Sequence, residues 1–149
     1  MEESAEGISE SAANAARELQ VVLGRLGRRA KEVSDNHQLT PSQVSVLSRL
    51  AKEGAASTSD LAAAERVRPQ SMAATLGVLD ERGLIQRRPD PGDGRRQLVS
   101  LSARGRETYQ GRRQEREAWL TRTLQDRYTE AELRVINEAL ALLERLTAP

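Results

Sequence analysis

Residues 68–75 bring together side chains that suit the edges of nucleic-acid bases. The stretch offers one guanidinium, one amide, two hydroxyls and a methyl group, and no carboxylate interrupts it: Arg68, Gln70, Ser71, Ala74 and Thr75. An amide can pair with N6 and N7 of adenine, hydroxyls can bond to several bases, and a methyl group can contact the thymine methyl. These residue types therefore indicate a DNA-reading surface if one element presents them on the same side.

A helix over residues 69–82 is the element expected to position them. Its inner face is set by apolar residues at positions i, i+4 and i+7, which are Met72, Leu76 and Leu79. Pro69 suits the first helical position, which makes Arg68 the N-cap, and Gly83 suits a left-handed C-cap. The base-reading residues then lie on the opposite face. An ordinary amphipathic surface helix remains the alternative on this stretch alone.

The residues that follow this helix predict a hairpin with a basic tip. Residues 84–88 and 97–101 have the character of short strands, and residues 89–96 between them are rich in Pro and Gly. Arg95 and Arg96 lie in that loop, with Arg87 and Arg88 at its base. A helix followed by strand, basic loop and strand is the arrangement of a winged helix-turn-helix.

From this point the sequence resembles the MarR family of bacterial transcription regulators. The resemblance is carried by Gly83-Leu84-Ile85, by Arg87 or Arg88, by Asp93-Gly94-Arg95 and by Val99 to Gly105, in the order and spacing of that family's signature. It covers about residues 15 to 147. Two positions depart from the family pattern. Ser102 stands where Thr is usual, and both residues cap helices. Arg68 replaces the usual Ser or Thr cap, so a phosphate contact could replace the capping bond.

These interpretations together give one set of predicted DNA contacts. Arg95 is expected in or along the minor groove, which attracts arginine where it is narrow, and Asp93 is expected to orient Arg95. The hydroxyls that open the short helix before the recognition helix, Ser59 among them, could donate to phosphate. The full predicted set is Arg68, Pro69, Gln70, Ser71, Ala74, Thr75, Arg87, Arg95, Arg96 and Ser59.

The predicted fold is mainly α with a small β-hairpin wing. Further helices are expected over about residues 11–33, from Thr40-Pro41, from Ser57 to Glu65, from Ser102 to about Gln125, and from Thr129. The resemblance implies that the first helix and the last two interlock with a second copy. The predicted domains are a tail at 1–10, an N-terminal dimerisation helix at 11–39, a winged helix-turn-helix at 40–101 and C-terminal dimerisation helices at 102–149. Such a homodimer would read a pseudo-palindrome. A monomeric helical cap is the alternative.

Charge distribution supports this division, although the net charge of the chain is only +1. Residues 66–113 contain 11 Arg and 5 Asp or Glu, a net charge of +6, which leaves −5 for the remainder. A basic middle between acidic ends is typical of a DNA-reading lobe with a separate assembly region. A solvated arginine-rich surface is the competing explanation.

Composition removes several other classes of protein. The chain has no cysteine and one histidine, so disulfides and thiol chemistry are absent and neither a metal nor a cofactor is expected. No apolar run approaches the roughly 20 residues of a membrane span, and the acidic N-terminus lacks a signal-peptide core. We therefore expect a cytoplasmic protein with no membrane partner. An enzyme is not expected, because the carboxylates are scattered and no phosphate-binding loop follows a strand.

The sequence thus predicts a sequence-specific regulator of transcription, a repressor in the first instance, bound to double-stranded DNA. A winged-helix adaptor that binds proteins is the alternative. The resemblance also implies release of DNA by a small aromatic or lipophilic effector. Wall residues proposed from approximate location are Arg17, His37, Arg49 and Trp119, each of which is more simply a surface or packing residue.

Overall fold

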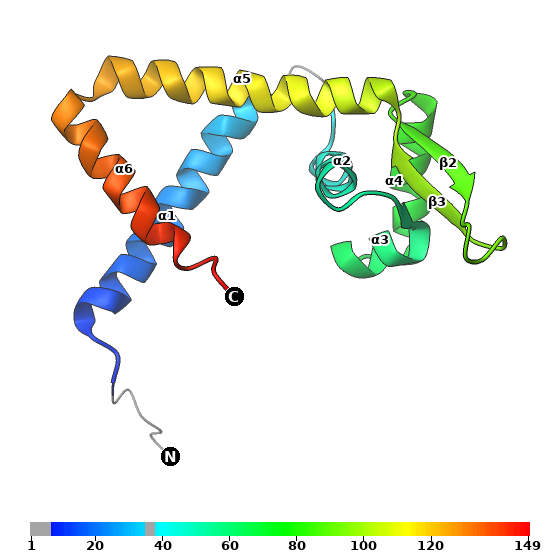
Figure 1. Ribbon diagram of the computed structural model, residues 1–149, viewed down its shortest axis with the longest axis horizontal. Helices are drawn as coiled ribbons and strands as arrows, with labels where there is room; N and C mark the ends of the chain where they lie inside the picture. Colours follow the sequence, from blue (N-terminus) through cyan, green and yellow to red (C-terminus); the bar gives the residue numbers. More distant parts are fainter. Residues whose placement is uncertain (1–6, 35–37) are drawn as a thin grey trace. The chain divides into compact units, whose positions relative to one another are not determined.

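The computed structural model describes residues 7–34 and 38–149, and within them it contains six helices and three strands (Figure 1). The helices are α1 (Glu10–Val33), α2 (Pro41–Glu53), α3 (Thr58–Glu65), α4 (Pro69–Glu81), α5 (Ala103–Arg127) and α6 (Glu130–Glu144), and the strands are β1 (Ala56–Ser57), β2 (Ile85–Pro89) and β3 (Gln97–Leu101). The predicted fold class, mainly helical with a hairpin wing, is confirmed. Most of the predicted tail and the whole of His37 lie outside the described residues.

The chain divides into two compact units, which we call the central unit (residues 34–115) and the terminal unit (residues 1–33 and 116–149). Helix α5 contributes its first half to the central unit and its second half to the terminal unit. The central unit is therefore longer than the predicted winged helix-turn-helix of residues 40–101.

The core of the central unit lies between α2, α3, α4 and a small antiparallel sheet. Leu47, Leu61, Leu76, Leu79 and Val99 are at most 1% exposed. The strand order is β1-β3-β2, with Arg87 opposite Val99 in one pair and Ser57 opposite Leu98 in the other. Strand β1 was not predicted, because its two residues carry no periodic signal of their own.

Helix α4 begins and ends as its sequence predicts. Pro69 is its first residue, and the Arg68 cap makes no side-chain hydrogen bond, as expected for a residue without a short acceptor. At the other end Gly83 has φ +70°, and the amides of Gly83 and Leu84 donate to the carbonyls of Asp80 and Leu79. This pattern is a Schellman motif. Because Leu84 still closes the helix, the strand begins at Ile85, one residue later than expected.

A close junction joins the hairpin to the start of α5. The Ser102 hydroxyl donates to the Gly83 carbonyl over 2.5 Å and accepts from the Gly105 amide over 3.0 Å. A Cβ at position 105 would overlap the Leu84 carbonyl oxygen, so only glycine allows this approach. The N-terminal half of α5 is thereby fixed to the central unit.

Candidate nucleic-acid interface

The outward face of α4 presents the predicted base-reading residues to solvent. Gln70, Ser71 and Ala74 are exposed, whereas Met72, Leu76 and Leu79 on the opposite face are buried. Thr75 is half-buried, and its hydroxyl donates to the Ser71 carbonyl over 3.1 Å. Because the hydroxyl proton of Thr75 is used in this hydrogen bond, the hydroxyl oxygen can act only as an acceptor toward another group.

Val78 is a further member of this face that sequence reasoning missed. It is 38% exposed and lies three and seven residues after Thr75 and Ser71, on the same side of the helix. A branched apolar group can contact a thymine methyl, as proposed for Ala74. The sequence could have indicated this exposure, because Val78 lies outside the apolar stripe of Met72, Leu76 and Leu79 that is buried.

The tip of the wing is closed by backbone hydrogen bonds. The Arg96 amide donates to the Asp93 carbonyl over 3.0 Å, and the Asp90 amide donates to the Arg96 carbonyl over 2.9 Å. The Asp93 carboxylate accepts from the backbone amide of Arg95 over 3.0 Å. Asp93 therefore shapes the backbone that carries Arg95 rather than binding its guanidinium. Arg95 itself is exposed, and no hydrogen bond or ion pair of its guanidinium occurs with the described residues.

Arg96 and Arg87, by contrast, each have a carboxylate partner. Arg96 Nη2 donates to Asp60 Oδ2 over 2.8 Å and to Ser57 Oγ over 2.6 Å. Arg87 Nε donates to Asp80 Oδ2, also over 2.8 Å. Their predicted contacts with DNA remain predictions, and the structure gives both residues a role inside the protein.

The remaining predicted contacts are all exposed in the central unit. Arg68 and Pro69 lie at the start of α4, and Ser59 lies in the first turn of α3, where its hydroxyl is 3.2 Å from that of Ser57. The predicted base-reading, wing and phosphate-binding residues thus all belong to one compact unit.

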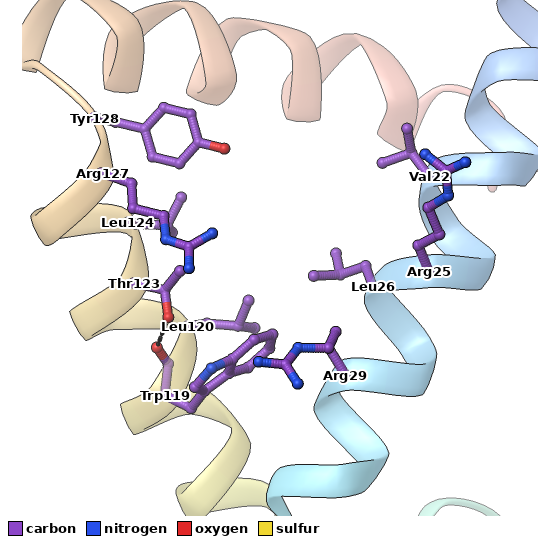
Figure 2. A pocket seen from close by; sticks show the side chains of 10 residues that line it. All are labelled: Val22, Arg25, Leu26, Arg29, Trp119, Leu120, Thr123, Leu124, Arg127 and Tyr128. Atoms are coloured by element: carbon purple, nitrogen blue, oxygen red, sulfur yellow. Dashed lines mark hydrogen bonds between the residues drawn. The ribbon is translucent and has the colours of Figure 1, made fainter.

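The terminal unit contains a pocket of about 590 Å³ between α1 and the second half of α5. Figure 2 shows the side chains of the two helices facing each other across it. Apolar side chains and three arginines form its walls: Val22, Arg25, Leu26, Arg29, Trp119, Leu120, Thr123, Leu124, Arg127 and Tyr128. Of the four residues proposed for an effector site, only Trp119 lines this pocket.

The other effector candidates have different surroundings. Arg17 is exposed on α1 and is not part of the pocket wall. Arg49 belongs to the central unit, where it donates to Glu65 over 2.8 Å and to Glu53 over 3.0 Å. These hydrogen bonds raise the pKa of Arg49, and those from Arg49 and Ser45 lower the pKa of Glu65. Arg49 is thus part of an α2–α3 contact.

The apolar faces of the terminal unit are largely uncovered. No residue of α1 or α6 is buried among the described residues, although both helices have an apolar side. Several large apolar side chains on them are between 42% and 64% exposed, namely Val22, Leu23, Leu26, Val135, Leu140 and Leu142. Large exposed apolar patches are rare in monomeric proteins and mark interaction sites.

No helix in the described part of the chain is long and apolar enough to cross a membrane. Residues 7–34 and 38–149 also contain no group of three or more His, Cys, Asp or Glu side chains placed to hold a metal ion.

The sequence of this chain is similar to those of known transcriptional regulators. A family model described as the MarR family matches residues 37–96. An HTH-type transcriptional regulator of Mycobacterium leprae is 38% identical over 115 residues, which cover 77% of this chain and 80% of that protein. An HTH-type transcriptional regulator of Mycobacterium tuberculosis matches to the same extent.

Solved structures share the fold over nearly the whole chain. A transcriptional regulator protein of Pseudomonas aeruginosa has a TM-score of 0.81 at 35% identity and covers 95% of this chain and 99% of its own. A mutant of Staphylococcus aureus MepR, solved bound to an oligodeoxyribonucleotide, has a TM-score of 0.68 at 18% identity and covers 90% of this chain and 98% of its own. The latter similarity concerns the fold alone.

Proposed function

Because the chain belongs to the MarR family of DNA-binding transcriptional regulators, we propose that it is a sequence-specific repressor that binds a pseudo-palindromic operator as a homodimer. The observation that carries this proposal is the exposed, carboxylate-free stretch of residues 68–75 at the start of α4, in the same unit as the exposed guanidinium of Arg95, which has no hydrogen bond or ion pair with the described residues. A major groove admits one helix, and a narrow minor groove attracts arginine.

Base recognition would rest on α4. Gln70 can pair with adenine, and the methyl groups of Ala74 and Val78 can contact thymine. Ser71 and Thr75 supply hydroxyl oxygens. Arg68 at the start of the helix, together with Ser59 on α3, would bind phosphates and set the position of the protein without reading sequence.

The homodimer would cover the apolar faces of α1 and α6. A second copy is a suitable partner for these faces, since it would bring an acidic helix α6 to the basic walls of the pocket between α1 and α5. Helix α6 carries four glutamates and one arginine, whereas the pocket between α1 and α5 presents Arg25, Arg29 and Arg127. Two-fold pairing would place the two recognition helices on half-sites about one helical turn apart.

Repression is the mode of action we propose, because a dimer seated on an operator excludes other proteins from the same DNA. Release by a small aromatic or lipophilic effector is part of the same proposal. It requires a ligand that prefers a form of the dimer unable to span both half-sites. Its test is loss of operator binding in the presence of such a compound.

The deciding experiment is selection of bound sequences from random duplex DNA at near-physiological salt, followed by titrations at higher salt. A pseudo-palindromic motif is the expected result. Salt-sensitive binding without a motif would favour an adaptor or architectural role, and absence of binding to any duplex would overturn the proposal.

Gln70→Ala should relax preference at one base pair in each half-site by about 1–3 kcal/mol. Measuring its affinity for operators altered at single positions would reveal which base Gln70 reads. Gln114→Ala removes the same amide from an exposed position on α5 and should leave the preferences unchanged. Equal preferences for the wild-type protein and the Gln70 variant would remove Gln70 from the recognition surface.

A further inference from the structure

We propose that Arg96 is a positioning residue, which bonds to Asp60 and Ser57 and thereby holds the wing where Arg95 can enter the minor groove. This inference rests on the proposed function and assigns Arg96 a different task from its neighbour.

The partners of Arg96 lie at a fixed point of the central unit. Ser57 is 4% exposed, belongs to β1 and pairs with β3 through its register with Leu98. It is also the N-cap of α3, since its hydroxyl oxygen accepts from the Asp60 amide over 3.1 Å. Arg96 donates to that same oxygen and to the Asp60 carboxylate. One guanidinium therefore fastens the wing to a strand and to the start of a helix.

The closure of the wing tip transmits this attachment to Arg95. The amide and carbonyl of Arg96 bond to the backbone of Asp93 and Asp90, so residues 90–96 form one closed loop. The Asp93 carboxylate fixes the amide of Arg95 within it. With the guanidinium of Arg96 turned to α3, the adjacent Arg95 extends from the loop into solvent. Breaking the contacts of Arg96 would leave the Arg95 side chain in place on the loop, but its position would no longer be fixed.

The charge of Asp60 makes the inference testable by the sign of an effect. Asp60 is an exposed anion in a unit that would bind a polyanion, so electrostatics alone predicts that neutralising it strengthens DNA binding. The positioning role predicts the opposite, because Arg96 would lose its carboxylate partner. Exposed ion pairs contribute little to folding, so the variants should remain folded.

The experiment compares full-length wild type with D60N, R95A and the double variant D60N/R95A on the selected operator, with melting curves to verify folding. D60N is expected to weaken binding about three- to ten-fold. In the R95A background the same change should have no further effect, because Asp60 acts through Arg95. E107Q, which removes an exposed carboxylate elsewhere in the central unit, is the matched control and should bind no more weakly than wild type.

Two results would overturn the inference. D60N that binds as tightly as wild type, or more tightly, would show that the ion pair does not position the wing. If D60N weakened binding in the R95A background by the same factor as in the wild-type protein, its effect would be independent of Arg95. Each would leave the proposed function standing, whereas a wild-type protein that selects no sequence would overturn both.

Discussion

Arg95 and Arg96 are adjacent and of one residue type, yet their surroundings differ. The guanidinium of Arg96 is bonded to α3, and that of Arg95 is turned to solvent. Residue type was therefore sufficient to predict a basic wing from the sequence. It was insufficient to divide the two roles, because Asp60 lies 36 residues before Arg96 and no local pattern links them.

Arg95→Ala should weaken operator binding several-fold or more and lower the dependence of affinity on salt, because a cation that displaces condensed counterions is removed. Fluorescence anisotropy titrations at several salt concentrations would measure both effects. Arg113→Ala removes an equal charge from an exposed position on α5 and serves as control. Equal affinities of the Arg95 variant and wild type at every salt concentration would exclude the wing from the interface.

Glu65 gives a prediction about pH at the same scale. Its carboxylate accepts from Arg49 Nε over 2.8 Å and from Ser45 Oγ over 2.7 Å, and these bonds hold its pKa below the usual value. The resulting stabilisation is present above the pKa of the unfolded chain, about 4.3, and is lost as pH falls through the lower pKa of the folded protein.

Glu65→Gln should therefore reduce the free energy of unfolding at neutral pH and lose that effect progressively below about pH 4.3. Urea denaturation at a series of pH values would measure the difference from wild type. Glu81→Gln, at an exposed carboxylate, provides the comparison. A difference that stays constant into acid would mean that the ionised carboxylate is not the source of the stabilisation.

At the scale of elements, the helix starts were the most predictable features, because their signals are local. Thr40 and Gln43 form a reciprocal capping box. The hydroxyls of Ser57 and Thr129 accept hydrogen bonds from the backbone amides of residues three positions later. Strand β1 could not be predicted, because it exists only through pairing with β3, some 40 residues away.

The junction of α5 with the hairpin gives a prediction at this scale. Gly105→Ala should destabilise the protein by about 1–3 kcal/mol, because the added methyl group meets the Leu84 carbonyl and the backbone must shift. Gly111→Ala is the matched control on the same helix. Nothing lies within 4 Å of its added Cβ, so it should stabilise by up to about 1 kcal/mol. Chemical denaturation would measure both variants, and equal effects would refute the assigned contact.

At the scale of the whole molecule, the amphipathic helices at both chain ends predicted an assembly region, and the terminal unit has the uncovered apolar surface that such a region requires. The partner could not be deduced from the sequence. An apolar stripe specifies that a face is to be buried and says nothing of which surface buries it.

Leu140→Glu should dissociate the proposed dimer, because it would bury an unpaired charge in the interface. Sedimentation or light scattering over a range of concentrations would report the mass. Ala141→Glu introduces the same charge on the side of α6 that carries Arg134, Asn137 and Glu144, and it should leave assembly intact. A Leu140 variant with the wild-type mass would place the interface elsewhere.

Trp119 on the pocket wall has a practical consequence. It is the only tryptophan in the chain, and it belongs to the terminal unit. Intrinsic fluorescence excited at the indole band therefore originates from the terminal unit alone and reports how exposed the pocket wall is to solvent. Far-ultraviolet circular dichroism records both units. Unfolding curves from the two signals would coincide if the units unfold together and would separate if the central unit can lose its structure while the terminal unit stays folded.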